Sequence, residues 1–147
     1  MKLTILISKL IIWFGDKMNR SSSLPGKVAL KLNKNILKSI KVPEKIIAVT
    51  GSSGKGTTSK MIANVLRSQG FKVVHNHRGG NLKTGIATML LEACNLNGKI
   101  KADYLVYEID ERYLKHVCKF LKPQIVVITN IVRDQPPRHG HFDYVYE

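Results

Sequence analysis

The chain has 147 residues, which leaves room for one domain with a hydrophobic core and excludes a second full domain. A hydrophobic content of 44% beside 23% charged residues excludes a wholly disordered chain. The formal net charge of +14 fits a nucleic acid, an anionic membrane surface or a phosphorylated ligand as binding partner. Residues 1–45 hold nine lysines and Arg20 against Asp16 and Glu44, so +8 of this charge lies in the first third.

The N-terminal segment 1–15 is an apolar stretch broken by Lys9, and it is shorter than the roughly 20 residues that a membrane-spanning helix needs. It lacks a small-x-small cleavage site, so we do not expect a removable signal peptide. Trp13, with Lys2, Lys9 and Lys17 around it, favours a helix that lies in the interface at the inner face of a membrane. A helix that packs on the domain explains the same pattern equally well.

The next segment separates two regions of the chain. Residues 20–26 cluster serine, proline and glycine and predict a loop, residues 27–40 indicate a short basic helix, and residues 42–43 predict an extended entry. We therefore expect a helical extension at 1–43 and a second region at 44–147. Cys94 and Cys118 lack the spacing of metal ligands, which favours two buried thiols in a reducing cytoplasm.

The second region alternates apolar segments with amphipathic ones. Strands are expected at 46–50, 71–75, 104–109 and 125–129, and three of them are nearly continuous apolar runs, as in parallel strands covered on both faces. The helical stripes are Met61, Ile62, Val65 and Leu66; Ile86, Met89, Leu90 and Ala93; and Leu114, Val117, Cys118 and Leu121. This alternation predicts an α/β fold, a parallel sheet flanked by helices, with ligands at the carboxyl ends of the strands.

The segment between the first strand and the following helix is rich in glycine and hydroxyl residues. Glycines let backbone N–H groups point inward, the helix N-terminus adds positive partial charge, and a lysine reaches the β- and γ-phosphates of a nucleotide. The match to G-x-x-x-x-G-K-[ST] is imperfect, because Val49 stands at the first glycine and Gly56 follows the lysine. The strand before and the helix after favour a P-loop over a chance glycine–serine turn. Its residues are Gly51, Ser52, Ser53, Gly54, Lys55, Gly56, Thr57 and Thr58.

The run TGSSGKGTT, residues 50–58, resembles the phosphate loop of the Mur ligase superfamily, whose usual form is T-G-T-N-G-K-T-T. Its Gly-Lys-Gly-Thr variant is similar to the folylpolyglutamate synthase branch. Four further segments look like the family of MurT subunits of lipid II isoglutaminyl synthase, in the same order and spacing. They are SLPGKVALK at 23–31, HNHRGGNL at 75–82, EIDE at 108–111 and TNIVRDQ at 129–135.

The resemblance implies an ATP-binding, Mg²⁺-dependent ligase of peptidoglycan biosynthesis. In that family a D-glutamate of the lipid II stem peptide is amidated to D-isoglutamine through an acyl phosphate, with ammonia from a GatD-type glutaminase subunit. The partners would be this glutaminase and a lipid-linked precursor, and no nucleic acid. A folylpolyglutamate-synthase-like ligase fragment or a non-catalytic nucleotide-binding fragment is the alternative.

The chain also departs from the family pattern. Two prolines follow Asp134-Gln135, and one acidic position of the relatives is lost there. The zinc insertion, the remaining central strands and the C-terminal domain of the family have no counterpart in this sequence. We therefore expect a truncated Mur ligase central domain that forms one wall of the catalytic cleft.

The resemblance assigns roles to five residues. Lys55 would neutralise the transferring phosphoryl group and, with Glu108, would be catalytic. Thr57 and Glu108 would hold Mg²⁺, which prefers oxygen ligands. Asn130 and Asp134 match family positions near the nucleotide.

Other polar residues have simpler interpretations. Asp110 and Glu111 fit a helix N-cap and an acid of the first turn. Asn81 and Thr84 either face the acceptor side of the cleft or belong to a loop and a helix cap. The histidines show no spacing of metal ligands; they are His75, His77, His116, His139 and His141.

Two other function classes are disfavoured. A GTPase would carry an [NT]-K-x-D motif after the fourth strand, where the chain reads TNIV at 129–132. A nucleic-acid-binding module would explain the net charge, but no zinc finger or RNA-binding aromatic signature is present in the sequence and the glycine-rich loop would have no role.

Overall fold

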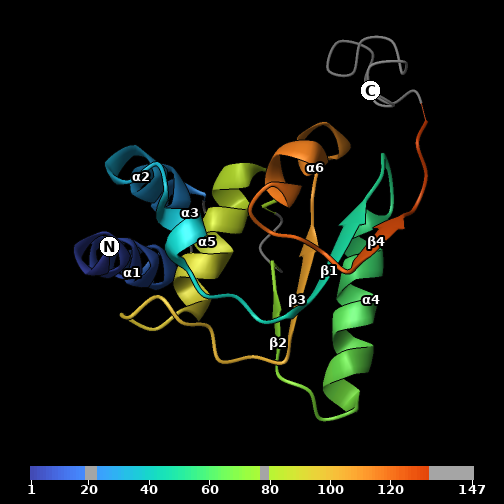
Figure 1. Cartoon of the computed structure of the whole chain (residues 1–147), viewed down its shortest axis with the longest axis horizontal. Coiled ribbons are helices and arrows are strands. Elements are labelled where there is room, and N and C mark those ends of the chain that lie inside the picture. Colours follow the sequence, from blue (N-terminus) through green and yellow to red (C-terminus); the bar gives the residue numbers. More distant parts are fainter. Residues whose placement is uncertain (19–22, 77–79, 133–147) are drawn as a thin grey trace.

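The computed structural model describes residues 1–18, 23–76 and 80–132. Helices and strands alternate after an N-terminal group of helices, which confirms the α/β class predicted from the sequence (Figure 1). The elements are α1 (Lys2–Lys17), α2 (Leu24–Leu32), α3 (Ile36–Ser39), β1 (Lys45–Thr50), α4 (Lys55–Ser68), β2 (Val73–His75), α5 (Lys83–Ala93), β3 (Tyr104–Glu108), α6 (Glu111–Cys118) and β4 (Ile125–Ile128).

The strands form one parallel sheet in the order β2-β3-β1-β4. Helix α4 covers one face, and α5 lies on the other face with α1, α2 and α3 behind it (Figure 1). Strand β1 serves both cores because successive side chains point to opposite faces. Ile46 and Ala48 pack with α5, whereas Ile47 and Val49 pack with Ala63 of α4.

The apolar run of β4 is not covered on both faces within the described part of the chain, contrary to the sequence-based expectation. Ile125, Val126 and Ile128 are exposed, and β4 pairs with β1 alone among the described strands. An edge position leaves apolar side chains uncovered that a central position would bury. The apolar character of this strand was predicted correctly, and its burial was not.

The apolar stripe predicted for the first amphipathic helix is buried at some of its positions and exposed at the others. Ile62 and Leu66 of α4 pack against the sheet, but Met61 and Val65 are both exposed. The buried face is centred on Ala63, one position away from the predicted line. The stripes of α5 and α6 agree with the structure, since Leu90 and Val117 are fully buried.

The region 20–40 differs from the prediction of a loop followed by one helix. Helix α2 already begins at Leu24, because Pro25 suits the first turn of a helix, where its missing N–H costs nothing. The helix ends at Leu32 with Asn33 as its C-cap, the Asn33 side chain accepts a hydrogen bond from the Asn35 N–H (3.0 Å), and α3 follows. Residues 20–22 of the predicted loop lie outside the described residues.

Helix α2 approaches α5 very closely. The N–H of Gly26 donates to Oγ1 of Thr88 (2.9 Å), and a Cβ on Gly26 would lie 2.0 Å from the carbonyl oxygen of Thr84. No larger residue fits at position 26 without moving one of the helices. This contact attaches the N-terminal helices to the sheet domain.

Helix α1 has two different faces. Thr4, Ile5 and Ser8 are buried against the domain, which confirms that the helix packs on it. The opposite face exposes a row of apolar side chains, namely Leu3, Leu6, Leu10, Trp13 and Phe14. Across the described ranges, no helix has both the length and the apolar character needed to cross a membrane.

Cys94 is buried and Cys118 is only partly buried, and both are free thiols.

Candidate phosphate-binding site

A tight loop joins β1 to α4 at the carboxyl edge of the sheet. Gly51 and Gly54 have φ values of 133° and 79°, which residues with a side chain rarely adopt. A Cβ on Gly51 would lie 2.3 Å from Oγ1 of Thr129, so the loop rests directly on the end of β4. The helix begins immediately afterwards at Lys55.

The end of β4 holds this loop through hydrogen bonds. The Ser52 N–H donates to the carbonyl oxygen of Asn130 (2.9 Å), and the Ser53 N–H donates to its Oδ1 (2.9 Å). Thr129 Oγ1 donates to the Ser53 carbonyl oxygen (2.6 Å). Asn130 therefore supports the glycine-rich loop, and its expected position near a nucleotide stays a prediction.

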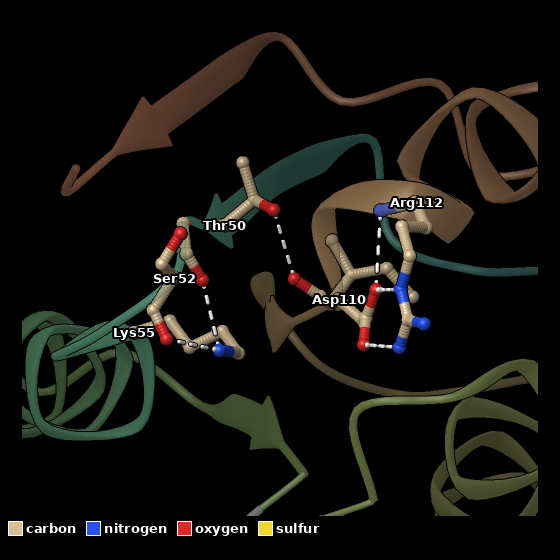
Figure 2. A network of polar contacts seen from close by, with 7 residues as sticks. Thr50, Ser52, Lys55, Asp110 and Arg112 are labelled. Atoms are coloured by element: carbon tan, nitrogen blue, oxygen red, sulfur yellow. Dashed lines mark hydrogen bonds and ion pairs between the residues drawn. The ribbon is translucent and has the colours of Figure 1, made fainter. Parts of the chain in front are cut away.

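The Lys55 side chain folds back over the loop instead of extending into solvent. Its Nζ donates to the carbonyl oxygens of Gly51 (2.8 Å) and Ser52 (3.1 Å), as the dashed lines in Figure 2 show. The ammonium group is thus held at the strand ends, beside the N-terminus of α4. Both the ammonium and the helix N-terminus favour an anion at this place.

Glu108 ends β3 and its carboxylate lies against the first turn of α4. A Cβ on Gly56 would lie 2.7 Å from Oε2 of Glu108, so the glycine after Lys55 is the residue that leaves space for the carboxylate. Only 8% of Glu108 is exposed. Burial raises the pKa of the Glu108 carboxyl, and the nearby Lys55 ammonium acts against this shift.

The oxygen donors near the first turn of α4 suit Mg²⁺, although they do not form a complete metal-binding cage by themselves. Thr57 is exposed in the first turn of α4, one residue beyond the glycine that touches Glu108. Among the described residues no group of three or more His, Cys, Asp or Glu side chains gathers as metal ligands would. One carboxylate and one hydroxyl suit Mg²⁺, which keeps waters and takes further oxygens from phosphate.

The turn after β3 is built by a helix cap. Asp110 accepts hydrogen bonds from the N–H of Arg112 (3.1 Å) and from its Nε (2.9 Å) and Nη2 (2.7 Å). Glu111 lies in the first turn of α6, so the predicted cap and first-turn acid are confirmed. Thr50 Oγ1 donates to the Ile109 carbonyl oxygen (2.9 Å) and ties this turn to the start of the loop (Figure 2).

Asn81 lies beside this cap, whereas Thr84 faces helix α2. The Asn81 carbonyl oxygen accepts from the Asp110 N–H (3.0 Å), and the Thr84 carbonyl oxygen accepts from Oγ1 of Thr88 (3.0 Å). Both contacts use backbone atoms of a loop and a helix start, as the simpler interpretation expects. A contact of either side chain with an acceptor substrate stays a prediction.

Sequence reasoning missed the roles of several residues near the site. It did not foresee that Arg112 pairs with the capping Asp110, that Asn76 contacts the backbone of Glu108, or that His75 Nε2 lies 3.0 Å from Oγ of Ser59. The sequence feature that could have indicated the role of Asn76 is its position directly after a predicted strand. Asp134, His77, His139 and His141 lie outside the described residues, and His116 is exposed on α6.

Comparison with protein families gives a direct match. The model of the Mur ligase middle domain matches residues 49–147, from the end of β1 onward. The chain belongs to the Mur ligase family. This is a family of ATP-dependent ligases, and the match confirms the superfamily resemblance deduced from the phosphate loop.

Similar curated Mur ligase relatives include subunits of a peptidoglycan-modifying synthase. The lipid II isoglutaminyl synthase (glutamine-hydrolyzing) subunit MurT of Streptococcus pneumoniae strain R6 is 40% identical over 131 residues, 89% of this chain and 29% of the relative. The MurT subunit of Staphylococcus aureus strain COL is 33% identical over 84% of this chain and 28% of its own length. The UDP-N-acetylmuramoylalanine–D-glutamate ligase of Nitratidesulfovibrio vulgaris strain DP4 is 39% identical over 69% of this chain and 20% of its own length.

A solved structure shows the same fold. The UDP-N-acetylmuramoyl-L-alanyl-D-glutamate–2,6-diaminopimelate ligase superposes with a TM-score of 0.55 at 22% identity, over 82% of this chain and 25% of that ligase. The chain spans less than a third of the length of the relatives and of this structure. It therefore carries one part of the Mur ligase architecture.

Proposed function

We propose that this chain is the MgATP-binding part of a MurT-type amide ligase. The observation that carries the proposal is the position of the Lys55 ammonium, 2.8 Å from the Gly51 carbonyl oxygen and at the N-terminus of α4. A buried carboxylate, Glu108, lies against the same helix turn. A cation beside a helix N-terminus, with an acid next to it, is an arrangement suited to a polyphosphate and its metal ion.

Each residue of the site has a separate role in the proposed function. The N–H groups of the glycine-rich loop and the α4 N-terminus bind the phosphates, and Lys55 neutralises the phosphoryl group during transfer. Thr57 and Glu108 hold Mg²⁺, which when bound offsets the charge on the phosphate oxygens. The Asn130 side chain accepts from the Ser53 N–H and donates to the Ser53 carbonyl oxygen, and these bonds keep the loop in its binding conformation. Preorganisation of this kind is the main contribution of a protein to phosphoryl transfer.

The proposed reaction activates a carboxylate and then amidates it. The phosphoryl group passes from ATP to the D-glutamate carboxylate of the lipid II stem peptide, and ammonia displaces phosphate from the resulting acyl phosphate to give D-isoglutamine. The names of the MurT relatives support lipid II as acceptor, and the words "glutamine-hydrolyzing" support a GatD-type glutaminase partner as the ammonia source. A folylpolyglutamate-type acceptor is the competing possibility, and trial of both acceptors in a full-length ligase that contains this region separates them.

Nucleotide binding tests the first part of the proposal. Titration calorimetry with MgATP is expected to show binding to the wild-type chain and at least about tenfold weaker binding to Lys55→Ala, because a charge-assisted contact is lost. Lys60→Ala is the matched control, since Lys60 is an exposed lysine of the same helix and should leave the affinity unchanged. Equal affinity of wild type and Lys55→Ala would refute the proposal.

We also propose that α1 contacts the inner face of the membrane that holds the lipid-linked precursor. Its outer face exposes 69% of Leu3, 50% of Leu10 and 51% of Trp13, and Lys17 Nζ lies 4.5 Å from the Trp13 ring. An apolar row with lysines beside it suits an anionic lipid surface.

The emission of Trp13 tests this contact, because the chain has a single tryptophan. Vesicles that contain anionic phosphatidylglycerol should shift this emission to shorter wavelength, and purely zwitterionic vesicles should shift it less. Leu10→Ser should weaken the effect, whereas Met61→Ser, at an exposed apolar position on α4, is the control. An emission maximum that does not move with anionic vesicles excludes the contact.

A further inference from the structure

Asn76 is a buried polar residue directly beyond the end of β2. Its Oδ1 accepts a hydrogen bond from the Glu108 N–H (2.9 Å), and its Nδ2 donates to the Glu108 carbonyl oxygen (2.9 Å). The same Nδ2 also donates to the Gly80 carbonyl oxygen (3.0 Å). Only 5% of Asn76 is exposed, so these bonds are shielded from water. One side chain thus satisfies both backbone polar groups of Glu108.

The position of Asn76 explains why an amide is needed there. The pairing of β2 with β3 ends at His75 and Val106, two residues before Glu108. Beyond this point the amide of Asn76 takes the place of a strand, because it carries a donor and an acceptor side by side. On the other side of β3, the Ile109 N–H donates to the Val49 carbonyl oxygen of β1 (2.9 Å). The backbone around Glu108 is therefore held from both sides.

We infer that Asn76 is a positioning residue that holds Glu108 in the orientation required for Mg²⁺. This inference rests on the proposed role of Glu108 as a metal ligand. The carboxylate lies so close to α4 that a single Cβ at Gly56 would be 2.7 Å from Oε2. Mg²⁺ demands near-ideal geometry at about 2.0–2.1 Å from its oxygen ligands. A small rotation of the Glu108 backbone would move the carboxylate out of that geometry, whereas Ser52 and Ser53 of the loop are held separately, by Asn130.

The test separates the metal from the nucleotide. Calorimetry with ATP in excess Mg²⁺ and with ATP in EDTA gives two affinities, and their ratio measures the contribution of the metal. In Asn76→Ala this ratio should fall at least about fivefold, with the affinity in EDTA near the wild-type value. Asn76→Asp, which keeps the size and the acceptor for the Glu108 N–H but loses the donor, should lower the ratio in the same direction and provides the test if Asn76→Ala does not fold.

Gln124→Ala is the matched control. Its Oε1 accepts from the Ile46 N–H (2.7 Å), so it also holds the backbone of a central strand, but at the opposite end of the sheet. A purely structural role of Asn76 predicts that both alanine variants lose thermal stability and keep the metal ratio. The positioning role predicts a lower ratio in the Asn76 variant alone. In a Glu108→Gln background, Asn76→Ala should cause no further fall in the ratio of the ATP affinities with Mg²⁺ and with EDTA.

The outcomes distinguish this inference from the function on which it rests. A wild-type ratio in folded Asn76 variants, together with a reduced ratio in Glu108→Gln, overturns the positioning role and leaves the proposed metal ligand intact. An unchanged ratio in Glu108→Gln overturns the metal role of Glu108 and the inference together. Loss of nucleotide binding in EDTA in Lys55→Ala tests the phosphate loop independently of both.

Discussion

The loop between β1 and α4, which is the proposed phosphate loop, and the contact between α2 and α5 both depend on glycine, but for different physical reasons. In the loop, Gly54 has a φ of 79° and no atom lies within 4 Å of where its Cβ would be. In α2, Gly26 has ordinary helical geometry, and its Cβ would lie 2.0 Å from a backbone oxygen of α5. The first glycine is required by conformation, and the second is required by space.

This difference shows how a proposed binding site and a packing contact are encoded in the sequence. The loop is specified locally, because its glycines, lysine and helix start are consecutive in the chain. The contact of α2 with α5 joins Gly26 to Thr88, which are 62 residues apart. Substitutions in the loop region should therefore alter ligand binding more than stability, and substitutions in the helix contact should do the reverse.

Of the two glycine substitutions, Gly26→Ala is expected to have the larger effect on stability. The added methyl group collides with backbone rather than with a flexible side chain, so we expect a loss of about 3 kcal/mol in the free energy of unfolding. Gly54→Ala should cost only about 1 kcal/mol, from left-handed strain. Urea unfolding of both variants checks the comparison. Equal losses would show that space and conformation are not the separate causes proposed here.

Glu108→Gln should have a smaller effect of the opposite sign on stability. Burial raises the pKa of Glu108 in the folded state, so the folded protein binds more protons than the unfolded chain between the ordinary glutamate pKa and the raised one. Stability contributed by this group therefore falls as pH rises through that window. Thermal unfolding should show Glu108→Gln to be more stable than wild type above the raised pKa and equal to it at acid pH.

The same pKa shift predicts the pH dependence of metal binding. The carboxylate form of Glu108 binds Mg²⁺, so the metal contribution to nucleotide affinity should grow as pH rises through the raised pKa of Glu108. In Glu108→Gln this pH dependence should disappear. Calorimetry at a series of pH values measures it, and a pH profile that persists in the variant would assign the titration to another group.

Asn130→Ala should weaken MgATP binding more than it lowers stability. The substitution removes the Oδ1 acceptor of the Ser53 N–H and the donor to the Ser53 carbonyl oxygen, both at exposed positions. We expect a stability loss within about 1 kcal/mol and a several-fold weaker affinity for MgATP. Parallel calorimetry and urea unfolding check this result. A stability loss as large as that of Gly26→Ala would contradict it.

The smallest expected effect is that of Trp13→Ala. About half of this side chain, 51%, is exposed on the outer face of α1, so the free energy of unfolding should change by less than about 0.5 kcal/mol. Ile5→Ala, on the buried face of the same helix, should cost about 2–5 kcal/mol. A large loss in Trp13→Ala would show that the outer face has a structural partner.

Much of the sheet domain was predictable because its signals are local. The alternation of apolar strands with amphipathic helices, the glycine-rich turn after β1 and the cap at Asp110 each depend on residues close together in the chain. The prediction for Glu108 rested on a family resemblance, and its contact with Gly56 was not foreseen. A Cβ at position 56 would lie 2.7 Å from Oε2 of Glu108, so a larger residue there would require the carboxylate to shift.

The amino-acid sequence by itself determined the fold class, the order of strands and helices after residue 44, and the family, because periodicity and a consecutive motif need no knowledge of distant partners. Only the tertiary structure decided that β4 lies at an edge of the described sheet, that Gly26 meets Thr84, and that Asn76 bonds to the backbone of Glu108. Each of these depends on which segments the parallel crossovers bring together, and contacts between residues far apart in the chain leave no periodic signal in either segment.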